Sequence, residues 1–400
     1  MQPAPPLAWL TMAEAPPQDQ TPPTPPHESY GRLFLRFLHF GLLAWGGPVA
    51  QIAMIRQELV EEKRWVSRER FNRVYALYQV LPGPEAHELC VYFGMTARGR
   101  LGGVLAGLGF MLPGFCLMLA LSWAYVAYGI ASPLFAAAFF GCKPAVIALI
   151  VRAVHRIGAH AITDHWLWGI AIGSAAASLA GVHFLVALPL AGGAYALLRR
   201  RPLPSAHAFF LLSPAFAAPA AAALFPSLPA LFGYGLRSGL LTFGGAYTVI
   251  PFLQHDAVVA GGWMTNAQFL DGLALSGIIP APLIIFSTFV GYLGGGLAGA
   301  VAMTAGIFLP AFAFTLIGHA YIEKLIGQQG IHAFLDGVAA GVVGLVAATA
   351  WVLLHSTVTG VPAAAIFALA LVAAYLWKAK GAVAGIMLGA ALLGWLLAPG

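Results

Sequence analysis

Long apolar runs, separated by short polar or basic stretches, make up most of the chain after residue 30. A run of about 20 apolar residues is long enough to cross the hydrocarbon core of a bilayer as a helix. The pattern therefore predicts an all-α polytopic membrane protein. The expected helices cover residues 31–55, 101–128, 134–156, 166–180, 182–198, 230–254, 297–320, 332–355, 361–377 and 381–398. The apolar segments 74–97 and 268–293 are each interrupted, and a charged loop is expected at 56–73.

Two stretches lack this pattern. Residues 1–29 contain nine prolines and neither Lys nor Arg, which is typical of a disordered, polyproline-like tail and not of a signal peptide. Residues 202–229 are rich in Pro and Ala and fit either a linker or a helix at the membrane interface. The predicted organisation is a tail (1–29), an N-terminal transporter repeat (30–201), a linker (202–229) and a C-terminal repeat (230–400).

The two repeats follow from self-similarity within the chain. Sliding the sequence by 198 residues places LLAWGGPVAQI, which starts at Leu42, on LLTFGGAYTVI, which starts at Leu240. The same shift places Trp65 on Trp263 and the LPGP of 81–84 on the IPAP of 279–282. Trp, Gly and Pro residues that recur at one spacing indicate two homologous halves.

Basic residues predict that the halves are inverted. The segment 56–73 carries six Lys or Arg residues, whereas its counterpart, 255–268, carries none. By the positive-inside rule the first segment is cytoplasmic and the second is external. Arg98 and Arg100 place the far flank of 74–97 inside as well, so this segment is expected to be a re-entrant hairpin. Each half then has about five spans and one hairpin, and an odd number of spans inverts the second half.

One observation conflicts with this topology, and one alternative stays open. Arg32 and Arg36 begin the first expected span and would lie on the outer side. If the interrupted segments instead cross the membrane, each half has six spans and the halves run parallel. Labelling of cysteines placed at positions 60 and 262 distinguishes the two, because only the parallel topology exposes both positions on the same face.

Composition supports the membrane assignment and excludes other classes. Apolar residues make up 60% of the chain and charged residues 8%, against about 25% charged in a soluble domain. The formal charge of +6 is spread over the segments between spans, which argues against a nucleic-acid partner. The three cysteines lie in apolar runs and are interpreted as small buried residues. Because there is no GxSxG, Walker A, dinucleotide or metal-ligand motif, no enzyme activity, metal or cofactor is expected.

Irregular backbone is predicted at two places in each half. The first is a Gly pair, Gly46-Gly47-Pro48 and Gly244-Gly245, and the second is a Pro-x-Pro, Pro82-Gly83-Pro84 and Pro280-Ala281-Pro282. Each Pro-x-Pro starts a new helix, whose free N–H groups and positive dipole end favour an anion. Broken helices at matched places in inverted repeats are typical of a transporter's central site. The alternative is that these Gly and Pro residues only permit helix packing.

Three ionisable residues follow the first Pro-x-Pro, namely Glu85, His87 and Glu88, whereas their counterparts in the second half are apolar. Ionisable groups inside apolar segments are functional candidates. A carboxylate here would repel a dianion unless it is protonated, which would link anion binding to proton binding. The alternative is that the two carboxylates only stabilise the dipole of the new helix.

Three basic residues lie within or beside the apolar run at 134–156. Lys143, next to Pro144, either neutralises an anion or extends its amine to the outer interface. Arg152 and Arg156 are expected to mark the cytoplasmic end of the helix at 134–156.

The motifs resemble the chromate ion transporter family in its long, two-domain form, over about residues 31–400. The segments that carry the resemblance are FGLLAWGGPVAQIAMIRQELV (40–60), RWVSRERF (64–71), QVLPGPEAHEL (79–89), TFGGAYTVIPFLQ (242–254) and SGIIPAPLIIFSTFVGY (276–292). The family's motif residues map onto Gly46, Gly47, Pro48, Pro82, Gly83, Pro84, Gly244, Gly245, Pro280 and Pro282. Two positions depart from the family pattern: Trp45 stands where Phe is usual, and Ala281 stands in place of Gly.

The resemblance implies a multi-pass protein of the inner (plasma) membrane that exports chromate and confers chromate resistance. It also implies dependence on the membrane potential or the proton motive force, with sulfate as a competing analogue. The expected function is therefore secondary active oxyanion efflux, with protons as a candidate second ion. A transporter of sulfate or another oxyanion and an anion channel are the alternatives, and a homodimer is left open.

Overall fold

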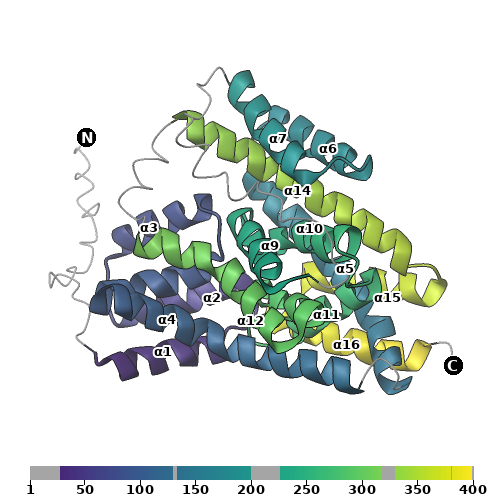
Figure 1. Ribbon diagram of the computed structural model, residues 1–400, viewed down its shortest axis with the longest axis horizontal. Coiled ribbons are helices and arrows are strands. Elements are labelled where there is room, and N and C mark those ends of the chain that lie inside the picture. The colour runs from purple at the N-terminus through teal and green to yellow at the C-terminus, as the bar shows by residue number, and fades with distance from the viewer. Residues whose placement is uncertain (1–27, 129–132, 200–225, 318–328, 380, 399–400) are drawn as a thin grey trace, which may run out of the picture.

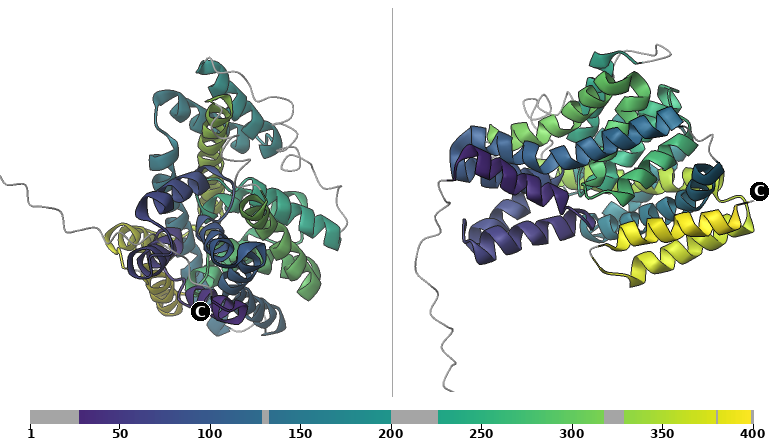
Figure 2. Two further views of the ribbon diagram at one scale, coloured as in Figure 1. Left: turned by 90° about the vertical axis from the view of Figure 1, so that its left-hand side faces the viewer. Right: turned by 90° about the horizontal axis from the view of Figure 1, so that it is seen from below.

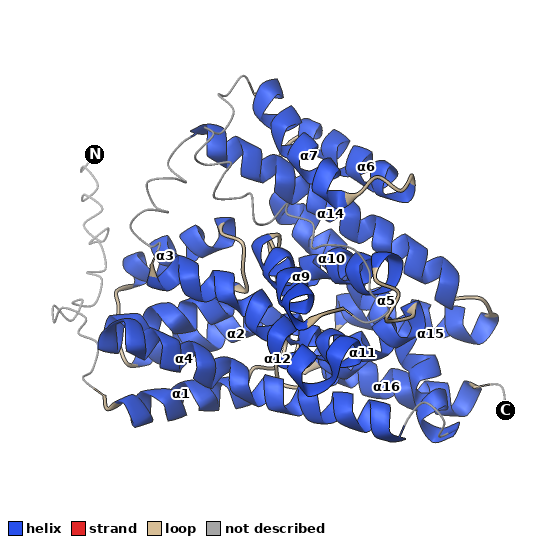
Figure 3. Cartoon of the chain, viewed as in Figure 1, coloured by secondary structure: helices blue, strands red, loops and turns tan. Residues whose placement is uncertain are grey.

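The computed structural model describes residues 28–128, 133–199, 226–317, 329–379 and 381–398. Helices account for nearly all of this part of the chain, and it holds no strand (Figure 3). The helices of the first half are α1 (Tyr30–Leu42), α2 (Gly47–Arg56), η1 (Gln57–Glu62), α3 (Arg68–Val80), α4 (Glu85–Tyr128), α5 (Pro133–Ala161), α6 (His165–Leu179) and α7 (Phe184–Leu198). The all-α prediction is confirmed. The expected tail and nearly all of the expected linker lie outside the described residues.

The second half repeats this order. Its helices are α9 (Leu228–Leu240), η2 (Ala246–Val249), α10 (Ile250–Gln254), η3 (His255–Ala260), α11 (Asn266–Ile278), η4 (Leu283–Ile285), α12 (Phe286–Leu316), α14 (Gln329–Thr357), α15 (Val361–Leu376) and α16 (Ala382–Leu397). The π-helical turns η1 and η3 lie 198 residues apart, which is the shift found in the sequence.

Four helical segments in the described chain are long and apolar enough to cross a membrane alone, at 85–128, 135–161, 283–316 and 331–357. These are α4 and α5 of the first half and their equivalents α12 and α14. The helices α7, α15 and α16 are apolar but have only 15 or 16 residues. The described residues thus hold two long apolar helices in each half, against the expected count of about five full spans.

The helix expected at 31–55 is two helices that form a re-entrant hairpin. The chain breaks after α1, where Gly46 and Gly47 adopt φ values of +87° and +78° that favour glycine. The chain then returns in α2, so that Arg36 of α1 forms an ion pair with Glu58 of η1 at 3.0 Å. Arg32 and Arg36 thus lie on the same side as segment 56–73. The conflict with the positive-inside rule disappears, because this segment does not cross.

The charged loop expected at 56–73 is largely helical. It contains η1 and the start of α3, where the Ser67 hydroxyl accepts a hydrogen bond from the amide of Arg70 at 3.2 Å. Glu61 forms ion pairs with Arg56 at 3.1 Å and with Arg68 at 2.5 Å. The charges of this segment therefore did not mark a loss of helix, because they neutralise one another.

The interrupted segment of each half breaks at its Pro-x-Pro, as predicted. In the first half α3 ends at the Pro-Gly-Pro break and α4 begins at Glu85. Within α4 the chain turns sharply at Arg98 and Gly99, where Gly99 has a φ of +64°. A Cβ on Gly94 would collide with Gly102, so residues 85–97 and 100–128 are closely packed antiparallel legs. In the second half Gly296 has a φ of +59° at the equivalent turn of α12.

The two halves run in opposite directions where they meet. A Cβ on Gly103 of α4 would touch Leu316 of α12, whereas one on Gly107 would touch Phe312. Positions that advance along α4 therefore recede along α12, so these equivalent helices are antiparallel. In Figure 1 the colours show that α4, along the lower edge, and α12 run in opposite directions. The packing supports inverted halves.

The last two helices of each half pack on the other half. α6 and α7 lie against α14, and α15 and α16 lie against α5 (Figures 1 and 2). Gly141 of α5 contacts Ala390 and Gly394 of α16, and Gly337 of α14 contacts Gly192 of α7 in the same way. Small residues allow this close approach. Gly141 and Gly337 are therefore equivalent, and α5 corresponds to α14 at a spacing of 196 residues.

Candidate functional site

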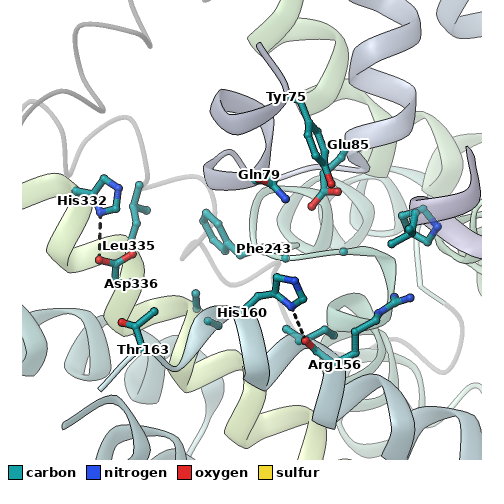
Figure 4. Close-up of a pocket in the computed structure, with 17 residues that line it drawn as sticks. Tyr75, Gln79, Glu85, Arg156, His160, Thr163, Phe243, His332, Leu335 and Asp336 are labelled. Carbon is teal, nitrogen blue, oxygen red and sulfur yellow. Dashed lines mark hydrogen bonds and ion pairs between the residues drawn. The ribbon is translucent and has the colours of Figure 1, made fainter. Parts of the chain in front are cut away.

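A cavity of about 500 Å³ opens between the two halves. Its walls come from α3, the start of α4 and the start of α2 in the first half, and from the C-terminal part of α5. The second half supplies the break before η2 and the N-terminal part of α14 (Figure 4). α5 begins beside the end of α4 that is far from Arg98 and runs back, so its C-terminal part brings the cavity toward the side that carries Arg36, Arg56 and Arg98. This side is here called the basic side, and the positive-inside rule makes it cytoplasmic.

Polar side chains face each other across this cavity. Gln79 and Glu85 enter from one wall, and Arg156 and His160 from the opposite wall (Figure 4). His160 Nδ1 lies 2.8 Å from the carbonyl oxygen of Arg156. Arg156 and His160 both interact electrostatically with the Glu85 carboxyl group. The cavity therefore has a basic wall and an acidic wall that face each other.

A third wall carries an acid and a base of its own. His332 and Asp336 of α14 form an ion pair at 3.1 Å and line the cavity with Leu335 and Ala339. Both charged side chains are exposed, so this pair lies toward the mouth of the cavity.

Arg156 and His160 are the main groups that sequence analysis missed. The helix at 134–156 was expected to end at Arg156, but α5 continues to Ala161. Arg156 is therefore more than one turn inside the helix and faces the cavity, whereas a helix-end arginine would face the cytoplasm. The available signal was the spacing of Arg152, Arg156 and His160, which places all three on one helix face.

The Gly-pair breaks of both halves meet this cavity. Pro48, directly after Gly46 and Gly47, lines it, and so do Gly244 and Gly245. Gly244 and Gly245 have φ values of +76° and +116°, so the break needs glycine on backbone grounds. The starts of α2 and η2 thus lie at the cavity, where free N–H groups can meet an anion.

The Pro-Gly-Pro break lies next to the cavity and links the halves. Pro82, Gly83 and Pro84 are buried, and the Gly83 amide donates a hydrogen bond of 2.9 Å to the carbonyl oxygen of Thr242. Thr242 immediately precedes the second half's own break. The two kinds of motif, which the sequence could only place separately, therefore contact each other.

His87 and Glu88 are fully buried and do not line the cavity. The His87 ring packs between Phe308 and Phe312 of α12, with ring centres 4.9 and 4.7 Å away. Neither oxygen of the Glu88 carboxyl group has a hydrogen-bond partner among the described residues. A Cβ on Gly83 would lie 2.7 Å from a Glu88 oxygen, so the break at Gly83 makes the space that Glu88 fills.

The second Pro-x-Pro serves a different contact. Between Pro280 and Pro282, Ala281 packs against Gly114 of α4, where a Cβ on Gly114 would lie 2.6 Å from the Ala281 methyl group. Pro280 and Pro282 do not line the cavity. The exchange of Gly for Ala at this position is accommodated by glycine on the facing helix.

Lys143 is separate from the cavity. Its Nζ lies 3.3 Å from Asp271 Oδ1 of α11, and the hydroxyl of Tyr125 donates a hydrogen bond of 3.0 Å to Asp271 Oδ2. Lys143 and Arg156 are 13 residues apart on α5, which corresponds to about 20 Å along a helix. Within the described residues no group of three or more His, Cys, Asp or Glu side chains is arranged to hold a metal ion.

The comparisons with known proteins agree with this architecture. The sequence model of the chromate transporter family matches twice, at residues 31–197 and 229–395. A chromate transport protein of Pseudomonas aeruginosa is 56% identical over 396 residues, which is 95% of each chain. A chromate transport protein of Cupriavidus metallidurans is 33% identical over 94% of this chain and 95% of its own.

A probable chromate transport protein of Synechococcus elongatus is 33% identical over 88% of this chain and 91% of its own. No solved structure matches the chain. A chain with two inverted halves, matched in both by one family and along nearly its whole length by these relatives, belongs to the chromate transporter family.

Proposed function

We propose that this protein is a secondary active transporter that exports chromate from the cytoplasm across the inner membrane. The relatives named as chromate transport proteins support the substrate. The cavity supports the direction, because its charged walls open toward the basic side. A tetrahedral oxyanion dianion, either chromate or its analogue sulfate, is the ligand that this chemistry fits.

The observation that carries the proposal is the position of Arg156 and His160 opposite the broken helices. A guanidinium group can donate two parallel hydrogen bonds to an oxyanion. The starts of α2 and η2 add backbone donors on other sides of the same space. Together these groups replace the water that a dianion loses when it enters the protein. The Gly pairs act here by letting the backbone approach the ion.

The membrane potential is a sufficient energy source for export. Moving a dianion out of an inside-negative cell releases about 4.6 kcal/mol for each 100 mV, at about 2.3 kcal/mol per charge. Uptake would have to overcome the same free energy and would need a coupling ion. A cavity that faces the cytoplasm therefore fits an exporter driven by the potential.

Protons enter the mechanism through Glu85. An oxyanion between the two walls is attracted by Arg156 and repelled by an ionised Glu85, so the anion and a proton bind best together. Glu88 lies one helical turn further along α4 and away from the cavity, where a proton can neutralise its buried carboxylate. We therefore place the proton-linked step of transport at these two carboxyl groups.

Everted membrane vesicles provide the direct test. The cytoplasmic face of such vesicles points outward, so export appears as uptake of labelled chromate or sulfate. We expect saturable uptake that rises when a potassium diffusion potential makes the lumen positive and that stops when an ionophore collapses this potential. The control is a parallel set of vesicles without the protein.

Two other outcomes would replace the proposal. Accumulation only in right-side-out vesicles would make the protein an importer. Flux that rises linearly with substrate and does not saturate would make it an anion channel. Varying the pH gradient at a fixed potential separates the contribution of protons from that of voltage.

A further inference from the structure

The cluster of Lys143, Asp271 and Tyr125 joins three helices on the side opposite the cavity. Tyr125 is within one turn of the end of α4, and Asp271 is in the second turn of α11. The Asp271 side chain is fully buried, and the Lys143 side chain is 22% exposed. A buried carboxylate needs a compensating charge, which Lys143 supplies across the boundary between the two halves.

The inverted repeat relates this cluster to the cavity on the basic side. With α5 and α14 aligned on Gly141 and Gly337, Lys143 corresponds to Ala339, which lines the cavity on the basic side. Lys143 is therefore the first-half counterpart of a residue that lines the cavity from the second half. In an inverted repeat, exchanging the conformations of the two halves opens an equivalent cavity on the opposite side.

The charges of the existing cavity do not recur in its counterpart. By the same alignment Arg156 corresponds to Val352 and His160 to Ser356, and Glu85 corresponds to Leu283. Because Lys143 aligns with Ala339, the counterpart cavity has a cation in a wall that is otherwise uncharged. In the present conformation the Asp271 carboxylate occupies the place that an anion would take beside this amine.

We infer that Lys143 is the oxyanion contact of a second, outward-opening cavity, and that Asp271 masks this contact while the cavity on the basic side is open. The inference rests on the proposed function, because it assumes an oxyanion that crosses between the two sides. A lysine that must exchange its own carboxylate for the ion binds that ion weakly. This gives an exporter a release site of lower affinity than its loading site.

The test uses inhibition from the release side. Everted vesicles are preloaded with unlabelled sulfate, and uptake of labelled sulfate is measured. The quantity compared is a ratio, namely the lumenal sulfate concentration that halves this uptake divided by the external sulfate concentration that half-saturates it. We expect Asp271→Asn to lower this ratio about tenfold, because the amine is no longer masked, and Lys143→Met to raise it about tenfold. Opposite shifts from the two partners of one ion pair are not expected of a purely structural salt bridge.

Two further variants keep the test decisive if either single change prevents insertion. Lys143→Arg retains the cation and should keep inhibition from the lumen. The double variant Lys143→Met with Asp271→Asn removes both charges and should lose it. Equal ratios in these two variants, or shifts of Asp271→Asn and Lys143→Met in the same direction, would overturn the inference. Absence of any uptake by the unmodified protein would instead overturn the proposed function.

Discussion

The Pro-Gly-Pro break of the first half is followed by Glu85, whereas the Pro-Ala-Pro break of the second half is followed by Leu283. The helices of the two halves nevertheless pack alike: Gly41 of α1 lies against the carbonyl of Phe110 in α4, and Gly239 of α9 lies against the equivalent carbonyl of Ile307 in α12. The halves therefore share one geometry and differ in charge. Shared geometry can open the protein to either side, and different charge lets the two sides bind the ion unequally.

A second pair of contacts makes the same point. Arg36 lies over the ring of Trp65 at 5.6 Å, and Tyr234 lies 5.6 Å from the ring of Trp263, at the equivalent positions of the second half. The tryptophan recurs in both halves, but its neighbour is a cation in the first half and a tyrosine in the second, where Arg237 lies 5.4 Å from the Tyr234 ring. Equivalent positions thus keep the aromatic packing and differ in where the cation lies.

The largest expected effect is at Arg156, because the second half has Val352 in its place. Arg156→Gln should reduce potential-driven uptake into everted vesicles roughly 100-fold, which corresponds to about 3 kcal/mol of lost binding to a dianion. Arg152→Gln is the matched control, since Arg152 is one turn away on α5 and does not line the cavity. Equal loss in both variants would assign the effect to general charge and not to this site.

The next effect separates the two Pro-x-Pro breaks. Gly83→Ala places a methyl group 2.7 Å from the Glu88 carboxylate at a φ of +155°, and this strain of about 1–3 kcal/mol should abolish chromate exclusion by whole cells. Ala281→Gly removes a methyl group and should leave chromate exclusion within about twofold. Both proteins should reach the membrane, as measured by immunoblot. If Gly83→Ala transports normally, the break at Gly83 is not part of the transport machinery.

A smaller change is expected at Glu85, where charge and not geometry differs between the halves. Glu85→Gln should flatten the dependence of transport on cytoplasmic pH, because the cavity no longer needs a proton before it accepts the anion. Glu85→Asp keeps a carboxyl group and should retain the pH dependence, which makes it the control. A pH profile that Glu85→Gln leaves unchanged would mean that this carboxylate only stabilises the start of α4.

The smallest effects should be equal in the two halves. Gly99→Ala and Gly296→Ala each place a side chain at a positive φ, with nothing within 4 Å of the new Cβ, at a turn that both halves share. Each should lower the free energy of unfolding by about 1–2 kcal/mol, because L residues disfavour this backbone region. Thermal melting in detergent should show similar shifts for both. Clearly unequal shifts would show that the two turns are not equivalent.

Much of the architecture could be read from the chain because it depends on local properties. The shift of 198 residues located both kinds of break, and positive φ values confirm the breaks at Gly46, Gly47, Gly244 and Gly245. The contrast in basic residues between 56–73 and 255–268 predicted inverted halves, which the antiparallel packing of α4 on α12 supports. Glu85 was selected as an ionisable residue beside a break, and it lines the cavity.

Other features could not be read in this way. The segment 31–55 was long and apolar enough to span, and only the ion pair between Arg36 and Glu58 shows that it turns back. Lys143 was selected as a basic residue inside an apolar run, but its partner Asp271 lies in the other half. Arg156 was assigned to a helix end, and the structure shows that α5 continues past it to Ala161.

The sequence by itself determined that the chain is a helical membrane protein with two homologous halves, where each half breaks, and which end carries the positive charge. These properties follow from apolar length, from Gly and Pro backbone preferences and from charge beside a bilayer. Tertiary structure decided which breaks share a cavity, which charges meet, and that α6–α7 and α15–α16 exchange partners. The reason is physical: lipid is as apolar as a helix interface, so hydrophobicity cannot say which face meets a neighbour.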